Sequence, residues 1–158
     1  MRHELADLIE AFECAFRARV NRLSAYNQIN VTPFQAKVLL LVEKNIGCSQ
    51  QVIAEWLSRD KAQVARTVKE LETLKLIYRR PINIGGRILK LVLTVEGELI
   101  CRKLKQFRQI TMEDMLYSIS CEDQDRLVNF LSKVVKDLSE HSSKFDKPRS
   151  HRYEYETL

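Results

Sequence analysis

The sequence has little of what loops, metal sites and membrane spans require. Its 158 residues contain only 4 Gly and 3 Pro, a composition that disfavours a loop-rich β protein and favours long helices. No apolar run reaches the roughly 18 residues of a membrane span. Acidic residues also interrupt the N-terminal stretch, where a secretory signal needs apolar side chains. We therefore expect an α-rich cytoplasmic protein with no membrane segment.

Residues typical of catalytic and metal sites are scarce. The three histidines, His3, His141 and His151, lie near expected helix ends or in the C-terminal stretch, and the cysteines form no CxxC pair. No nucleophile lies at a suitable spacing from a base, and no glycine-rich loop is present to cradle a phosphate. The sequence therefore predicts no metal site, no cofactor and no enzymatic activity.

The four cysteines are expected to be reduced thiols. Cys14, Cys48, Cys101 and Cys121 are scattered singly, which is unlike a disulfide framework and typical of buried free cysteines. Cys14 is the first candidate for a redox-sensing thiol, because it lies on an apolar helix that could meet a second subunit. Such a role would require a lowered thiol pKa.

Positive charge is concentrated in the middle of the chain. Residues 33–94 contribute +6 to the formal net charge of +5, from 11 Lys and Arg against 5 Asp and Glu. Residues 1–32 balance at 0, residues 95–141 at −2 and residues 142–158 at +1. A basic segment between near-neutral segments is typical of a protein that binds a polyanion there.

Local patterns mark three helix starts in this basic segment. Thr32 followed by Pro33 predicts an N-cap and a first helical residue. Ser49 predicts the cap of a short helix, and Asp60 with Gln63 three residues later matches the capping-box pattern. Two helices joined by the tight turn before Asp60 indicate a helix-turn-helix.

The helix expected after Asp60 has a buried and an outward face. Val64, Val68 and Leu71 recur at i, i+4 and i+7, and so share the buried face. The outward face carries short, amide and cationic side chains: Lys61, Ala62, Gln63, Arg66, Lys69 and Thr73. Gln can bind adenine and Arg can bind guanine with paired hydrogen bonds, and the second helix of a helix-turn-helix makes such contacts from its N-terminal turns.

A charged helix face is more often simply solvated than bound to a ligand. The sign of the charge favours binding here, because residues 59–90 hold 9 Lys and Arg but only 3 acids. Solvated faces mix the two signs more evenly. We therefore expect this face to contact DNA.

A β-hairpin is predicted after this helix. Residues 76–82 and 87–94 are rich in β-branched and large apolar side chains, and they flank a turn at residues 83–86 that contains Asn and two Gly. The hairpin carries Arg79, Arg80, Arg87 and Lys90. An arginine-bearing hairpin after such a helix is typical of a wing whose arginines lie at the minor groove.

Long helices are expected on both sides of the basic segment. Residues 3–27 carry apolar side chains at steps of three and four, which marks one face of a helix that packs on a later helix or on a second copy of the chain. Thr94 and the Ser120–Asp123 pair predict the starts of two further long helices. Residues 142–158 lack periodicity and are expected to form a mobile tail.

With these features in place, the sequence resembles the MarR (multiple-antibiotic-resistance regulator) family over roughly residues 5–141. The similar strings are VTPFQAKVLLLVEKN, VARTVKELETLKLIYRR and GGRILKLVLTVEG. Leu93-Thr94, followed after two residues by Gly97, is one of the more specific marks. The resemblance implies a mainly α fold with a small β-hairpin wing. It places a winged helix-turn-helix at residues 32–94, helical dimerisation regions at 1–31 and 95–141, and a mobile tail at 142–158.

Two departures from the family pattern stand out. Gly85-Gly86-Arg87 replaces the usual Asp-x-Arg of the wing, so a more mobile wing tip is expected. Lys75 replaces the usual Gly after the recognition helix, where a left-handed conformation would cost on the order of 1 kcal/mol. We therefore expect the local turn to differ from that of the family.

The resemblance also implies a function. It implies a dimeric, sequence-specific regulator of transcription that binds double-stranded DNA, and more specifically a repressor released by a small aromatic ligand. The recognition helix, about residues 61–75, would enter the major groove, and the wing, about residues 77–93, would lie at the minor groove. The candidate DNA-binding residues are Ser49, Lys61, Gln63, Arg66, Thr67, Lys69, Arg80 and Arg87. The alternatives are a winged-helix module that binds protein, and a redox-sensing regulator that uses Cys14.

Overall fold

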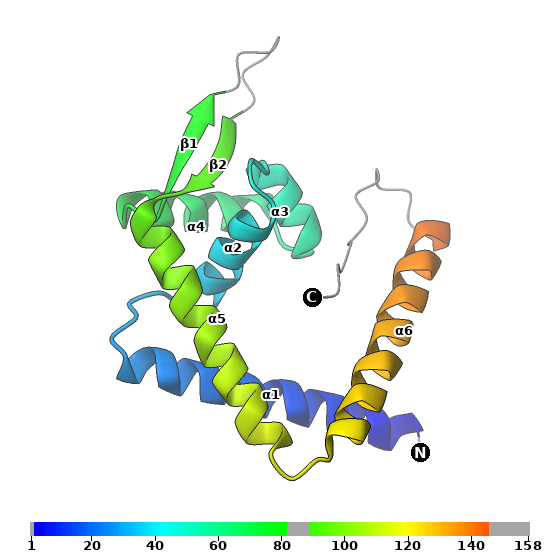
Figure 1. Ribbon diagram of the computed structural model, residues 1–158. Helices are drawn as coiled ribbons and strands as arrows, with labels where there is room; N and C mark the ends of the chain where they lie inside the picture. The colour runs from blue at the N-terminus through cyan, green and yellow to red at the C-terminus, as the bar shows by residue number, and fades with distance from the viewer. Residues whose placement is uncertain (1, 82–88, 146–158) are drawn as a thin grey trace. The chain divides into compact units, whose positions relative to one another are not determined.

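A computed structural model of the protein describes residues 2–81 and 89–145 (Figure 1). The elements are, in chain order, α1 (Arg2–Tyr26), α2 (Pro33–Lys44), α3 (Gln50–Trp56), α4 (Lys61–Thr73), β1 (Ile77–Pro81), β2 (Leu89–Leu93), α5 (Val95–Leu116) and α6 (Cys121–Phe145). The chain forms two compact units, residues 1–113 and residues 114–158. The predicted mainly α fold with one β-hairpin is confirmed.

A capping box starts α2. The Thr32 Oγ1 accepts a hydrogen bond from the Gln35 backbone N–H (3.2 Å), and the Gln35 Oε1 accepts one from the Thr32 N–H (2.9 Å). Pro33 occupies the first helical position, where its missing N–H costs nothing. The predicted cap at Thr32 is confirmed, whereas the burial of the Gln35 side chain was not expected from its polarity.

Side-chain caps also start α3 and α4, which form the predicted helix-turn-helix. The Ser49 Oγ accepts a hydrogen bond from the Val52 N–H (3.3 Å). The Asp60 Oδ1 accepts from the N–H groups of Ala62 (2.9 Å) and Gln63 (3.1 Å). Each cap satisfies backbone donors that have no partner within the first helical turn.

Lys75 terminates α4 in a left-handed conformation, with φ of 57°. The Lys75 N–H donates to the Glu72 carbonyl and the Leu76 N–H donates to the Leu71 carbonyl, both at 3.0 Å, which is the Schellman pattern of helix ends. The expectation of a different turn is therefore wrong, because Lys75 adopts the conformation that glycine would favour. The surrounding hydrogen bonds offset the cost to a residue with a Cβ.

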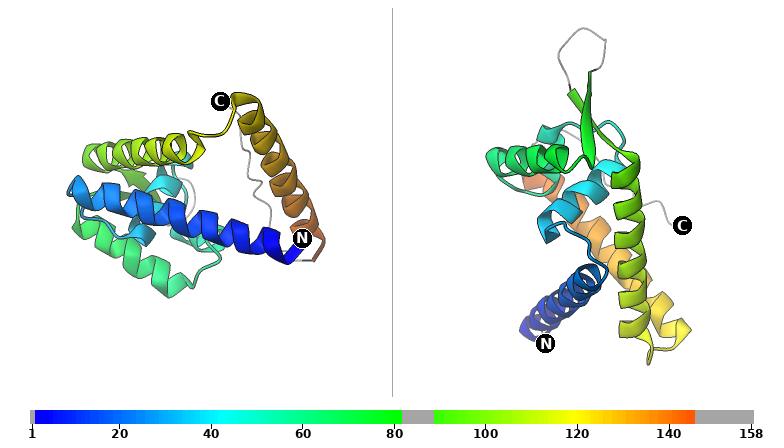
Figure 2. Two further views of the ribbon diagram at one scale, coloured as in Figure 1. Left: turned by 90° about the horizontal axis from the view of Figure 1, so that it is seen from below. Right: turned by 90° about the vertical axis from the view of Figure 1, so that its left-hand side faces the viewer.

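The hairpin pairs β1 and β2 in an antiparallel register that runs from Ile77 opposite Leu93 to Pro81 opposite Leu89. It projects away from α2, α3 and α4 (Figures 1 and 2). The backbone N–H of Leu91, in β2, donates to the carbonyl of Cys48 in the α2–α3 loop (3.0 Å). The predicted turn at residues 83–86 and Arg87 lie outside the described residues.

One apolar core joins α2, α3, α4, the hairpin and α5. Its buried members are Val38, Leu39, Val42, Ile53, Ala54, Val64, Val68, Leu71, Leu76, Ile77, Leu91 and Cys101. The three residues predicted for the buried face of α4 have no exposed surface. Because α4 is held by this core along one side, its opposite side is free to face a ligand.

Thr94 joins the hairpin to α5. The Thr94 backbone N–H donates to the Leu76 carbonyl (3.0 Å), and its hydroxyl donates to the Lys75 carbonyl (2.7 Å). The same hydroxyl oxygen accepts from the Gly97 N–H (3.1 Å). Gly97 is buried against Leu76 and leaves no room for a Cβ, so the Leu-Thr-x-x-Gly string fixes α5 to the end of α4.

The helix α1 keeps much of its apolar face exposed. Leu5, Leu8 and Ile9 are each more than half exposed. Farther along α1, the Phe16 ring faces the guanidinium of Arg108 in α5, 5.6 Å from the ring centroid. The predicted helix over residues 3–27 is confirmed, with only part of its apolar face covered within one chain.

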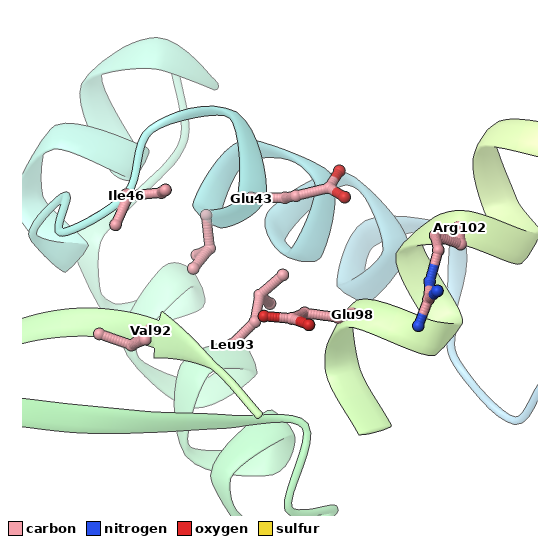
Figure 3. Close-up of a pocket in the computed structure, with 7 residues that line it drawn as sticks. Glu43, Ile46, Val92, Leu93, Glu98 and Arg102 are labelled. Atoms are coloured by element: carbon pink, nitrogen blue, oxygen red, sulfur yellow. The ribbon is translucent and has the colours of Figure 1, made fainter. Parts of the chain in front are cut away.

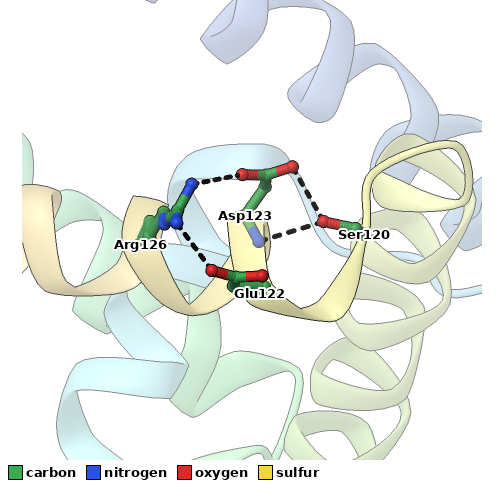
Figure 4. Close-up of polar contacts among 4 residues, drawn as sticks. All are labelled: Ser120, Glu122, Asp123 and Arg126. Carbon is green, nitrogen blue, oxygen red and sulfur yellow. Dashed lines mark hydrogen bonds and ion pairs between the residues drawn. The ribbon is translucent and has the colours of Figure 1, made fainter.

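The second unit begins at Asp114, in the last turn of α5, and contains α6. The Ser120 hydroxyl accepts from the Asp123 N–H (3.2 Å) and donates to the Asp123 carboxylate (2.7 Å), so the predicted cap is confirmed (Figure 4). Arg126 pairs with Glu122 (2.6 Å) and Asp123 (3.3 Å) on the same turn. Large apolar side chains are exposed along this helix: Leu127, Val128, Phe130, Leu131, Val134, Val135 and Leu138. The helix continues to Phe145, beyond the predicted end near residue 141, and residues 146–158 of the expected tail lie outside the described residues.

Candidate nucleic-acid interface

The outward face of α4 carries the predicted polar side chains. Lys61, Arg66 and Lys69 are exposed, and Gln63 is half-buried beside them. At a rise of about 1.5 Å per residue, this face extends about 12 Å from Lys61 to Lys69. That length is comparable with the roughly 12 Å width of the DNA major groove.

The cations on this face are not engaged by the protein itself. Across residues 2–81 and 89–145, no ion pair involves Lys61, Arg66 or Lys69. The carboxylate of Asp60, the nearest acid at the start of α4, is occupied by backbone N–H groups. Three positive charges are therefore available to an anionic partner.

Thr67 differs from the other candidates on α4. It is 6% exposed, so its side chain does not share the outward face with Arg66. A step of about 100° per residue places Thr67 between Gln63 and Leu71 around the helix, and this signal would have identified it as a flank of the buried face. Thr67 therefore contributes to the packing of α4 in the free protein and is not part of its exposed polar face.

Two adjacent arginines of β1 have different environments. Arg80 is exposed, and the structure gives it no ion pair with the described residues. The Arg79 Nε donates to the Glu72 carboxylate at 2.8 Å, and its terminal nitrogen donates to the Gln50 side-chain oxygen at 3.4 Å. From the sequence, Arg80 was predicted to contact DNA and Arg79 was given no role, so the contacts of Arg79 with Glu72 and Gln50 are new.

A second polar contact missed by sequence analysis joins α2 to α4. The Gln35 Nε2 donates to the Glu70 carboxylate at 2.9 Å, while the Gln35 Oε1 completes the capping box with Thr32. Gln35 and Glu70 are 35 residues apart, so no local sequence pattern predicts their contact. The buried amide therefore holds α4 against the start of α2 and supports the outward face indirectly.

Ser49 is half-buried at the start of α3. Its oxygen accepts the hydrogen bond from the Val52 N–H, and a hydroxyl that accepts can still donate through its own hydrogen. Ser49 can therefore cap α3 and donate to a phosphate oxygen at the same time.

A cavity of about 520 Å³ lies at the base of the hairpin (Figure 3). Its lining combines apolar side chains from α2, the α2–α3 loop and β2 with two carboxylates and a guanidinium. The lining residues are Val42, Glu43, Ile46, Val92, Leu93, Glu98 and Arg102. Cavities of this size accept small organic molecules.

The thiols differ in exposure. Cys14 and Cys121 are exposed, Cys48 is half-buried and Cys101 is buried. Burial raises the pKa of the Cys48 thiol. Burial, together with the Glu43 carboxylate, raises the pKa of Cys101 to about 12. The expectation that all four are mostly buried is wrong for Cys14 and Cys121, and the redox role of Cys14 stays a prediction.

Two absences concern residues 2–81 and 89–145. Their His, Cys, Asp and Glu side chains form no group of three that could hold a metal ion. None of their helices combines the length and hydrophobicity that a membrane span needs.

Comparison with known proteins assigns the winged region. A sequence model of the MarR family matches residues 29–88, which run from the start of the helix-turn-helix into the hairpin. Residues 29–88 of the chain are thus similar to the MarR family. Members of this family are transcriptional regulators and not enzymes, and the similarity supports the same general role for this chain.

Individual proteins have a similar sequence or the same fold. The chain is 25% identical over 113 residues to the uncharacterized HTH-type transcriptional regulator YybA of Bacillus subtilis, a match covering 72% of this chain and 75% of YybA. The crystal structure of the transcriptional regulator SlyA has the same fold, with a TM-score of 0.72, 23% identity, and coverage of 89% of this chain and 99% of SlyA. Apo wild-type MarR from E. coli also shares it, with a TM-score of 0.70, 21% identity, and coverage of 82% and 96%.

Proposed function

We propose that the protein is a MarR-family regulator that binds double-stranded DNA as a homodimer and represses transcription until a small ligand releases it. The observation that carries the DNA-binding part is the row of unpaired cations on α4. Lys61, Arg66 and Lys69 flank Gln63 on a helix face that the core leaves free. Lys and Arg side chains neutralise phosphates, and Arg and Gln also hydrogen-bond base edges.

The side chains divide into two roles. Gln63 and Arg66, in the first two turns of α4, contact base edges in the major groove. Lys61, Lys69 and Ser49 contact phosphates, which position the protein without reading sequence. Arg80, and Arg87 on sequence grounds alone, contact the minor groove from the wing.

Exposed apolar surface supports the homodimer. Side chains along one face of α6, among them Val128, Leu131 and Leu138, are exposed in the single chain, and so are Leu5 and Leu8 of α1. Large exposed apolar patches usually mark an interface. A second copy that covers these helices would place two α4 faces on one DNA duplex, as a two-fold symmetric operator requires.

The cavity at the base of the hairpin supports ligand release. Val92 and Leu93 line the cavity and belong to β2. A bound molecule would therefore contact this strand and could change the position of the wing. A hydroxybenzoate is a suitable probe, because its ring matches the apolar lining, its carboxylate can pair with Arg102 and its hydroxyl can donate to Glu98. Saturating hydroxybenzoate should weaken DNA binding by the protein, and a Val92→Trp variant with a filled cavity should lose this response. The exposed-strand variant Leu89→Trp is the control and should retain it.

Selection of duplexes from a random pool tests the core of the proposal. We expect enrichment of a pseudo-palindrome whose half-sites lie about 10 base pairs apart, because a two-fold dimer reads successive major grooves. Salt-dependent binding without enrichment of any sequence would show that the protein binds DNA without sequence specificity. Absence of salt-dependent duplex binding, together with a stable protein partner, would instead support the protein-interaction alternative.

A further inference from the structure

Arg79 contacts both helices of the helix-turn-helix from the hairpin. Its Nε donates to Glu72, on the last turn of α4, at 2.8 Å, and its terminal nitrogen donates to Gln50, the first residue of α3, at 3.4 Å. The Arg79 and Glu72 side chains are 35% and 29% exposed. One guanidinium therefore bridges α3, α4 and β1.

The direction in which the hairpin leaves α4 depends on very few residues. Only residues 74–76 separate the end of α4 from β1, and Lys75 among them is in the left-handed conformation. The core holds Leu76 and Ile77 at the start of β1, and on β2 it holds Leu91, which lies opposite Arg79 and donates its N–H to the Cys48 carbonyl. Arg79, two residues beyond Ile77, adds a side-chain contact from β1 to the helices at the level where Leu91 ties β2 to the α2–α3 loop.

The side chains of adjacent strand residues point to opposite faces, so Arg79 and Arg80 cannot contact the same partner. The charge of Arg79 is already matched by Glu72, and two edges of its guanidinium are used. Arg80 is exposed and has no ion pair among the described residues. The first arginine faces the protein and the second is free for DNA.

We propose that Arg79 and Glu72 are positioning residues, which fix the wing on α4 so that Arg80 meets the DNA while Arg79 makes no DNA contact. This inference rests on the proposed DNA binding by α4 and the hairpin. Exposed ion pairs contribute little to folding stability, so the pair acts on the direction of the wing and not on whether the chain folds.

The substitution Glu72→Gln separates this role from simple electrostatics. Removal of a negative charge near DNA should by itself strengthen binding to the polyanion. If the pair positions the wing, Glu72→Gln should instead weaken binding to the selected operator by about three- to tenfold. Glu96→Gln is the matched control, since it removes the same charge from an exposed residue of α5 that has no ion pair with described residues.

The partner substitution Arg79→Gln completes the cycle. Arg79→Gln, Glu72→Gln and the double variant should all weaken operator binding, because each breaks the Arg79–Glu72 pair, and the double variant should lose less than the sum of the two single variants. A phosphate contact by Arg79 would lower the salt slope of Arg79→Gln by about 1 relative to Glu72→Gln. That difference in slope, or binding by Glu72→Gln as tight as by Glu96→Gln, would overturn the proposal.

Hydrogen exchange in the free protein gives an answer that needs no DNA. Amides of β1 and β2 should exchange faster in Glu72→Gln than in the unaltered protein or in Glu96→Gln, with the thermal midpoint little changed. Unaltered exchange in the hairpin would refute the positioning role even if operator binding is confirmed. Failure of the unaltered protein to bind any duplex would instead refute the proposed function, while the exchange result would still decide whether the pair holds the hairpin.

Discussion

A Cβ atom placed on Gly97 would lie 2.1 Å from the backbone carbonyl oxygen of Leu76. That oxygen already accepts the Thr94 N–H at 3.0 Å, so it cannot move away without loss of a hydrogen bond. The side chain of Thr94 then caps the first turn of α5 through the Gly97 N–H. Leu-Thr-x-x-Gly is thus a packing motif, in which threonine supplies the cap and glycine supplies the space.

Gly97→Ala should destabilise the protein strongly. The clash is with backbone and not with a flexible side chain, so relief requires α5 to shift relative to the end of α4. We expect a loss of roughly 2–4 kcal/mol in the free energy of unfolding, measured by urea denaturation. Gln106→Ala, at an exposed position of the same helix, should stay within about 0.5 kcal/mol. Equal stability of the two variants would show that α5 and the Leu76 carbonyl can move apart without loss of stability.

Lys75→Gly should stabilise the protein. Lys75 has φ of 57°, and the left-handed conformation costs a residue with a Cβ roughly 1–2 kcal/mol. Glycine relieves this cost but loses more backbone entropy on folding, so a net gain of about 0.5–1 kcal/mol is expected. Lys75→Ala removes the same side chain while keeping the Cβ, and it should give no gain. Stabilisation by alanine as large as that by glycine would argue against backbone strain.

Caps were predictable from the sequence because they depend on neighbours. Thr32, Ser49, Asp60 and Ser120 each lie within three residues of the N–H groups that they accept from. The buried stripe of α4 was predictable for the same reason, since its period is set by the helix itself. From the sequence, Gly97 was only a mark of the family resemblance, because the Leu76 carbonyl that makes glycine necessary lies 21 residues earlier in the chain.

Contacts between distant residues were not predictable. Arg79 meets Gln50, 29 residues away, and Gln35 meets Glu70, 35 residues away. Such pairs follow only from the placement of elements around the core. Thr67, named as a DNA-binding candidate, is 6% exposed, and its helical angle beside Leu71 already indicated this burial from the sequence.

Gln35→Met should destabilise the chain by roughly 1–3 kcal/mol. Methionine keeps the volume of the buried side chain but loses both the capping-box acceptor for Thr32 and the donor to Glu70. Chemical denaturation measures the change. Gln51→Met, on the exposed side of α3, is the control and should change stability by less than about 0.5 kcal/mol. A loss no larger than that of the control would mean that solvent replaces both hydrogen bonds.

Cys101 should make stability fall at alkaline pH. Burial, with the Glu43 carboxylate, raises its folded-state pKa from the ordinary 9.0 to about 12. Below about pH 9 both states hold the proton, and between pH 9 and 12 only the unfolded thiol loses it. The free energy of unfolding should therefore decline by up to about 1.4 kcal/mol per pH unit in that window.

Comparison with Cys101→Ala isolates this contribution. The variant loses packing at every pH, but the pH-dependent difference from the unaltered protein should shrink as pH rises from 9 to 12. A constant difference would show that Cys101 ionises in the folded state as readily as in the unfolded state. Alkylation at pH 8 offers a second check, since exposed Cys14 and Cys121 should react while Cys101 reacts only after unfolding.

Arg66→Ala and Lys69→Ala should weaken DNA binding in different ways. Loss of a base contact by Arg66 should cost roughly 1–3 kcal/mol on the operator and relax the preference at one base pair. Loss of a phosphate contact by Lys69 should weaken all duplexes alike and lower the salt slope by about 1. Titrations of operator and scrambled duplexes at several salt concentrations measure both. Uniform weakening by Arg66→Ala would reassign Arg66 to the phosphates.

Because glycine is scarce, residues with a Cβ occupy most of the left-handed turn positions in the described part of the chain. Within the described residues, Gln28, Ser58 and Lys75 hold left-handed conformations, while Gly47 is the one glycine that does so. Each of the three side chains restricts the conformations open to the denatured ensemble, whereas glycine would widen it. The native state therefore carries backbone strain at these three turns, and the denatured chain loses less conformational entropy on folding than it would with glycine there.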